Sequence, residues 1–148
     1  MTTTPVLTGR DIGITYQAIA AIRDRLLADV GMTFEDSIQL NVLADAPAAT
    51  APSSQIVAVL VAGLKLSDEA ASAAIDALVS RGHATRGADT VTATEHALDA
   101  HQRFTALVAE LAPRLYGDIP TADLAAAKRV LDIVTERANR QLAVSANA

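Results

Sequence analysis

The chain has 148 residues, 51% of them hydrophobic but only 3% aromatic, and a formal net charge of −5 at neutral pH. This length suffices for one domain with its own core, and the acidic charge argues against a generally basic nucleic-acid binder. The lack of cysteine excludes disulfides and thiol chemistry, and the lack of an apolar run of about 18 residues excludes a membrane-spanning helix. An N-terminus without a basic and apolar signal pattern predicts a cytoplasmic protein.

Two helices are expected in the first third of the chain, and each opens with a capping box. In the first, Thr8 and Asp11 stand three residues apart, and the helix runs to about Val30. In the second, Thr33 and Asp36 repeat the same spacing. The residues predicted to form the buried face of the second helix are Phe34, Ile38 and Val42, with Leu43 as a further candidate.

A stretch rich in proline and small residues, 45–53, follows these helices. Pro47 and Pro52 prevent a continuous helix here, so a loose surface loop is expected. Ser53 or Ser54 is predicted to cap the next helix, because Ser is favoured at this position.

A helix-turn-helix is predicted at the centre of the chain, from a short helix over 56–62, a turn over 63–65 and a longer helix. The longer helix is capped by Ser67 and closed by Gly82, which can adopt the left-handed conformation that ends a helix. Two short segments that follow, 83–86 and 90–93, are expected to pair as a two-stranded wing.

Two further helices are predicted after the wing, the first capped by Thr94 and the second by Thr121. Pro113 should kink the first of them or shorten it by a turn. The apolar faces of these two helices and of the N-terminal helix exceed what one small lobe can cover, so a homodimer built from both termini is expected.

Several short motifs occur in a characteristic order: Val42-Leu43, Leu66-Ser67, Ile75-Asp76-x-Leu78, Arg81-Gly82-His83-Ala84-x-Arg86 and Thr94-x-x-Ala97. In this order and spacing the chain resembles the MarR family of bacterial transcription regulators, over about Thr8 to Leu142. The resemblance implies a mainly α fold, a winged helix-turn-helix with a small two-stranded β wing and a helical dimerisation region. It also implies a single domain over 1–148, with a winged-helix lobe at 33–93 and dimerisation helices at 8–30 and 94–143.

The resemblance further implies a homodimer that binds DNA. The residues expected to contact DNA are Lys65, Ser67, Ser72, Arg81 and Arg86. The chain departs from the family pattern at Asp68 and Glu69 on the recognition helix and in its short wing. These acids either stabilise the start of the helix or disable DNA contact, so a dimer that binds or transforms a small molecule is the alternative.

Family members often bind small apolar ligands between the lobe and the dimerisation helices. The residues that would line such a pocket are Ile12, Tyr16, Ile19, Ile38, His101 and Phe104, although core packing explains an aromatic residue on an apolar face equally well. His96 and His101 lie five residues apart, which is wrong for two metal ligands on one helical face. The sequence therefore predicts no metal and no cofactor, and it contains no recognisable catalytic constellation.

Overall fold

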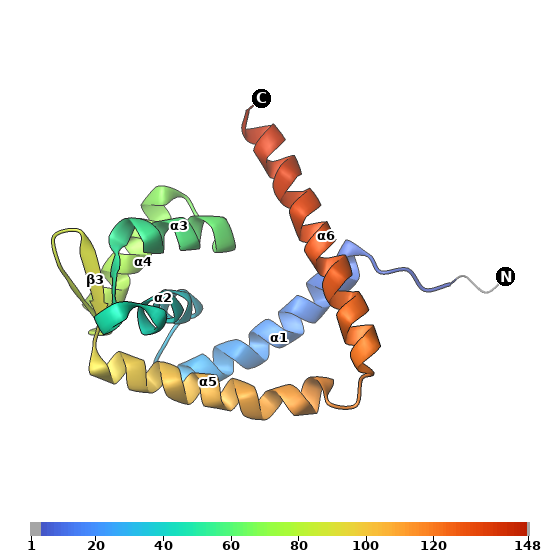
Figure 1. The fold of residues 1–148 in the computed structure, drawn as a ribbon, viewed down its shortest axis with the longest axis horizontal. Helices are drawn as coiled ribbons and strands as arrows, with labels where there is room; N and C mark the ends of the chain where they lie inside the picture. The colour runs from blue at the N-terminus through green and yellow to red at the C-terminus, as the bar shows by residue number, and fades with distance from the viewer. Residues whose placement is uncertain (1–3, 148) are drawn as a thin grey trace. The chain divides into compact units, whose positions relative to one another are not determined.

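The computed structural model describes residues 4–147, and Figure 1 shows a mainly helical fold with one small sheet, as predicted. The elements in chain order are α1 Gly9–Asp29, α2 Phe34–Asp45, the 3-10 helix η1 Pro47–Ala49, β1 Thr50–Pro52, α3 Ser53–Leu64, α4 Asp68–Ser80, β2 Ala84–Arg86, β3 Thr90–Ala93, α5 Glu95–Tyr116 and α6 Thr121–Ala146. Contacts divide the chain into two compact units, one ending at Ala109 and the other beginning at Glu110.

The predicted capping boxes open both of the first two helices. The backbone N–H of Asp11 donates to Thr8 Oγ1 at 3.3 Å, and the N–H of Thr8 donates back to Asp11 Oδ2 at 2.8 Å. Thr33 and Asp36 make the same two bonds at the start of α2. Ser67 caps α4, so local side-chain chemistry fixes where these three helices begin.

Two other predicted caps are wrong. Pro52 occupies the N-cap of α3, and neither Ser53 nor Ser54 serves as its cap. Pro120 occupies the N-cap of α6, which leaves Thr121 as the first helical residue. In both cases the hydroxyl residue lies one place too far along the helix to accept a bond from the orphan N–H groups of the first turn.

The sheet has three antiparallel strands in the order β1-β3-β2, one more than the predicted wing. Thr92 of β3 pairs with Thr50 of β1 on one side and with Thr85 of β2 on the other. The hydroxyls of Thr50 and Thr92 lie 2.8 Å apart. Part of the expected loop over 45–53 is therefore strand β1, with Pro52 on the edge of the sheet, where its missing N–H costs no ladder bond.

Helix α2 lies at the centre of the first unit, in contact with α1, α3, α4 and β3. Its fully buried apolar residues are Leu40 and Leu43, whereas the predicted Phe34, Ile38 and Val42 are only partly buried. The spacing of apolar residues did not predict the most buried positions of α2, because a helix that packs on several sides buries residues on more than one face.

The turn between α3 and α4 begins later in the chain than predicted. Helix α3 continues through Gly63 to Leu64, and Lys65 takes the left-handed conformation, with φ of 57°. Gly82 also has a positive φ, 78°, and follows the end of α4 as predicted. The helix-turn-helix is therefore formed by α3 and α4, with a lysine at the position that usually favours glycine.

The second unit contains the end of α5 and the whole of α6. Pro113 lies inside α5, which continues to Tyr116, so this proline does not shorten the helix. No residue in the described span of α6 is buried, and it exposes Leu131, Val134 and Leu142 by 42%, 43% and 56%. Over residues 4–147, no helix is long and apolar enough to cross a membrane.

Candidate nucleic-acid interface and ligand cleft

Helix α4 presents one apolar face to the first unit and a small, polar face to solvent. Ala71, Ile75 and Leu78 are buried in the core. The residues on the exposed face of its N-terminal half, including the N-cap, are Ser67, Asp68, Glu69, Ala70, Ser72 and Ala73. One side of this helix is therefore packed against the core, and the other side is exposed.

The three basic residues between positions 33 and 93 all have intramolecular partners. Lys65 Nζ donates to the carbonyl oxygen of Ala62 at 2.6 Å. Arg81 binds Asp36, and Arg86 binds Asp76. The same span contains seven acidic residues and so carries a net charge of −4. The predicted DNA-contacting cations are present on the lobe, but each of them is engaged in a contact with the chain itself.

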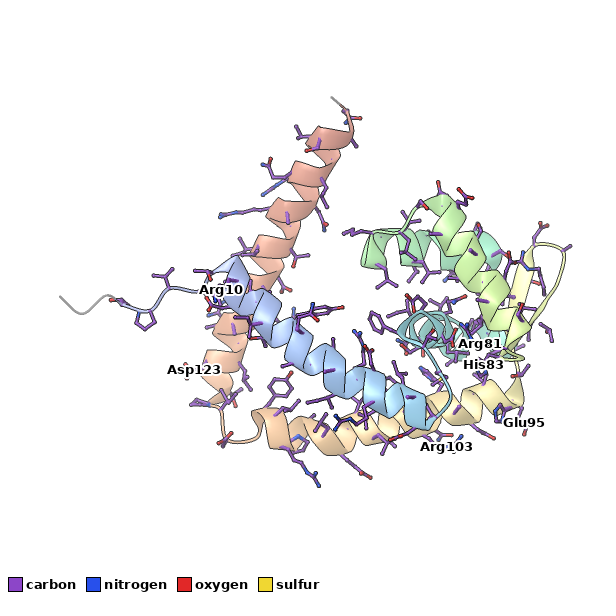
Figure 2. The ribbon with its side chains drawn as sticks, turned by 180° about the vertical axis from the view of Figure 1, so that it is seen from behind. Arg10, Arg81, His83, Glu95, Arg103 and Asp123 are labelled. Carbon is purple, nitrogen blue, oxygen red and sulfur yellow. The ribbon has the colours of Figure 1, made fainter. Side chains whose placement is uncertain are left out.

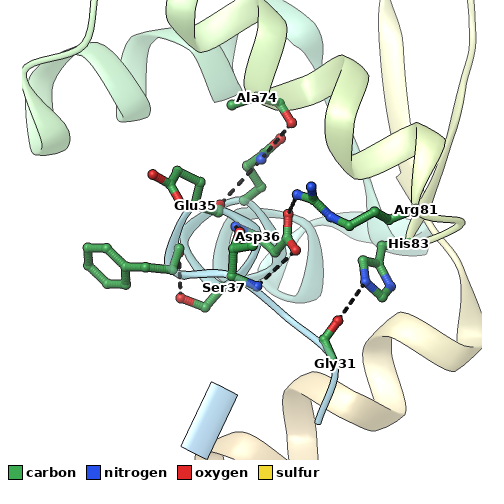
Figure 3. Close-up of polar contacts among 10 residues, drawn as sticks. Gly31, Glu35, Asp36, Ser37, Ala74, Arg81 and His83 are labelled. Atoms are coloured by element: carbon green, nitrogen blue, oxygen red, sulfur yellow. Dashed lines mark hydrogen bonds and ion pairs between the residues drawn. The ribbon is translucent and has the colours of Figure 1, made fainter. Parts of the chain in front are cut away.

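Asp36 and Arg81 form a buried ion pair beside the start of α2 (Figure 3). Asp36 is fully buried and also accepts the N–H of Thr33 at 3.0 Å. The side chain of Arg81 is 40% exposed. Because a buried carboxylate needs a counter-charge, this pair fixes the end of α4 against α2 and leaves Arg81 little freedom.

Arg86 and Asp76 form a different kind of pair, on the surface. Arg86 Nη2 lies 2.7 Å from Asp76 Oδ1, and the two side chains are 44% and 69% exposed. The pair connects β2 with the middle of α4. Solvent screens such a pair, so it contributes little to stability.

His83 lies next to Arg81, where α4 leads into the sheet (Figure 2). Its side chain is 6% exposed, and its Nε2 lies 3.2 Å from the carbonyl oxygen of Gly31. Its ring stacks with that of His96 at a centroid distance of 6.4 Å. Within residues 4–147 no cluster of three metal-ligating side chains occurs.

The six residues predicted to line a ligand pocket are not gathered in one place. Tyr16 and Ile19 are exposed on α1 by 52% and 40%, and Ile12 is half-buried there. Ile38 and Phe104 pack against the core of the first unit. His101 is half-buried with its Nε2 2.7 Å from Asn41 Oδ1, and burial lowers its pKa against a weaker opposing effect of Asp45.

A cleft of about 430 Å³ does lie between α1 and the start of α2, and Tyr16 is one of its lining residues. The guanidinium carbon of Arg23 lies 3.6 Å from the ring centroid of Phe34 and 5.9 Å from that of Tyr16. Burial lowers the pKa of Arg23, but Tyr16 and Asp24 outweigh it and raise the pKa above its usual value. No pattern in the sequence brings Arg23 and Phe34 together, because they lie on two different helices.

No protein-family model and no curated protein matches the chain. Many solved structures match its fold. The MarR family transcriptional regulator Sco5413 from Streptomyces coelicolor aligns with a TM-score of 0.72 at 16% identity, over 88% of this chain and 92% of that one.

Two further solved structures contain a bound partner. Sco3205, a MarR family transcriptional regulator from Streptomyces coelicolor in complex with DNA, aligns with a TM-score of 0.64 at 15% identity, over 90% and 91% of the two chains. CouR from Rhodococcus jostii RHA1, bound to p-coumaroyl-CoA, aligns with a TM-score of 0.61 at 17% identity, over 84% and 91%. The chain therefore has the winged-helix fold of the MarR family transcriptional regulators.

Proposed function

We propose that this protein is a MarR-like transcriptional regulator that binds DNA as a homodimer. The observation that carries the proposal is the exposed N-terminal half of α4, held as the second helix of a helix-turn-helix by its buried Ala71, Ile75 and Leu78. Such a helix enters the major groove with its N-terminal residues. The likeness in fold to Sco3205, whose structure contains DNA, supports the same use of α4 here.

In this proposal residues 33–93 form the DNA-binding lobe, and residues 8–30 and 94–143 dimerise. Two copies of α4 would then meet successive major grooves about one helical turn apart. Ser67 and Ser72 can donate hydroxyl hydrogen bonds to phosphates, and Ala70 and Ala73 can contact thymine methyl groups.

The net charge of the lobe sets an expectation for how DNA affinity depends on salt. Affinity for phosphates depends on how many of them basic residues neutralise, and the lobe has only Lys65, Arg81 and Arg86. Arg81 is held by a buried carboxylate. We therefore expect modest affinity with a shallow salt dependence, in which contacts to base edges supply most of the selectivity.

A carboxylate placed on the groove-facing side of α4 tests the proposal. In vitro selection from a random duplex library supplies a DNA probe, and fluorescence anisotropy measures its affinity. Ser72→Glu should weaken binding by about tenfold or more, because a new charge would face the phosphates. The matched control is Ser80→Glu, since Ser80 is also exposed but ends the helix. Failure of the selection, or equal behaviour of the two variants, contradicts DNA binding through α4.

The cleft around Tyr16, Arg23 and Phe34 favours a second candidate function. In this candidate function the protein is a dimer that no longer binds DNA but binds or transforms a small molecule. An arginine beside aromatic rings suits a planar anion. The p-coumaroyl-CoA complex of CouR supports ligand binding by this fold. A thermal-shift screen of aromatic carboxylates against the wild type and Arg23→Met would detect such a site, and shifts that are identical in both proteins would contradict it.

A further inference from the structure

The ion pair between Arg86 and Asp76 lies on the side of α4 proposed to face DNA. Asp76 is three residues from Ala73 and four from Ser72 on the same helix, and residues at these spacings share one helical face. Arg86 extends from β2 toward this face and meets Asp76 at 2.7 Å. A phosphate that approached Arg86 would therefore also approach the carboxylate of Asp76.

Arg86 can leave Asp76 for another anion, whereas Arg81 cannot leave Asp36. Asp36 is fully buried, so loss of Arg81 would leave an uncompensated charge in the interior. Asp76 is 69% exposed, and water can solvate it when Arg86 leaves. Of these two arginines, only Arg86 can turn to a phosphate without burying an unpaired charge.

We infer that Asp76 competes with DNA phosphate for Arg86, so that this single surface ion pair limits the affinity of the lobe for DNA. The inference rests on the proposed DNA binding. When Arg86 binds a phosphate, a counter-ion leaves the DNA, but another counter-ion associates with the freed carboxylate of Asp76. The net release of counter-ions is therefore small. The freed carboxylate then also repels the neighbouring phosphates. Asp76 therefore reduces both the affinity and its salt dependence.

Asp76→Asn, measured in the full-length protein, tests this competition. The probe is a labelled random-sequence duplex of about 30 base pairs, long enough for two half-sites, titrated by anisotropy between about 50 and 200 mM salt. The variant should bind roughly two- to fivefold more tightly for each half-site, the range expected from the strength of an exposed pair. The slope of log affinity against log salt should steepen by about 0.9 for each half-site.

Two further comparisons assign the gain to Arg86. Adding Arg86→Ala to Asp76→Asn should remove both the tighter binding and the steeper slope, because no arginine is then left at this position to bind a phosphate. Arg86→Ala alone completes the double-mutant cycle. Asp132→Asn removes an equal charge from the exposed pair with Lys128 on α6 and should leave the slope unchanged.

The outcomes separate this inference from the proposal beneath it. The competition is contradicted, and the proposed DNA binding is not, if the wild type binds DNA and Asp76→Asn binds equally tightly or more weakly. The same conclusion follows if Asp76→Asn binds more tightly and the gain persists when Arg86→Ala is added. Absence of binding by wild type and by Asp76→Asn at the lowest salt would overturn both the competition and the proposed DNA binding. Unchanged thermal unfolding midpoints establish that the variants are folded.

Discussion

Asp36 is a fully buried carboxylate that takes part both in the capping box of α2 and in the ion pair with Arg81. Its place three residues after Thr33 predicted its role in the capping box correctly. The ion pair with Arg81 could not be predicted, because 45 residues separate the two and no local pattern records that separation. The family resemblance implies a DNA contact for Arg81, and the structure adds that its side chain binds a buried carboxylate.

Arg81→Ala should therefore act mainly on stability. Removing the partner of fully buried Asp36 should lower the free energy of unfolding by about 2–3 kcal/mol, somewhat less than for a wholly buried pair because Arg81 is partly exposed. Urea unfolding followed by circular dichroism would measure this. Arg86→Ala is the matched control, since it breaks an exposed pair and should cost less than about 1 kcal/mol. Equal losses in the two variants would contradict the structural role of Arg81.

At the level of helices and strands, prediction succeeded where local chemistry determines the result. Thr8, Thr33 and Ser67 cap the helices they were expected to cap, because a capping hydroxyl and the backbone N–H that donates to it lie within one turn. Strand β1 was missed, because its three residues show no apolar alternation and acquire their pairing only from β3, about 40 residues later. The candidate pocket residues are scattered, and Arg23 and Phe34 line a cleft, because the packing of α1 against α2 follows from contacts between helices that no local pattern records.

The turn between α3 and α4 offers a test at this level. Lys65 has a positive φ of 57°, a conformation that disfavours side chains with a Cβ atom. Lys65→Gly should raise the free energy of unfolding by about 1 kcal/mol through relief of this strain, yet weaken DNA binding through loss of a charge. Urea unfolding and anisotropy measure the two effects.

Lys65→Ala separates strain from charge at this position, because it removes the ammonium group but keeps the Cβ atom. It should match Lys65→Gly in DNA affinity and show no gain in stability. A stability gain of the same size in both variants would exclude strain as the cause, and unchanged DNA affinity in both would exclude Lys65 as a phosphate contact.

At the level of the whole molecule, several large apolar side chains are exposed on α6 and on α1. Helix α6 exposes Leu131, Val134 and Leu142, which share one helical face, and α1 separately exposes Ile14 and Ile19. Large apolar patches on a surface are typical of interfaces between proteins. The predicted homodimer would cover such faces.

Leu131→Glu should convert the dimer to a monomer or weaken it by at least tenfold, since it places a charge in an apolar interface. Sedimentation velocity over a range of protein concentrations measures the change. Ala125→Glu adds the same charge to an exposed position on another face of α6 and should leave the dimer intact. A wild-type protein that sediments as a monomer at all concentrations would exclude the predicted homodimer.

The pairing of β1 with β3 has a consequence for how the lobe folds. Thr50 and Thr92 are 42 residues apart, and the chain between them contains the whole helix-turn-helix. Closing so long a loop costs more entropy than forming the contacts within α3 and α4, and such non-local contacts slow folding. The two helices should therefore associate before β1 joins the sheet, and the pairing of β1 with β3 should be the last contact of the lobe to form and the first to open.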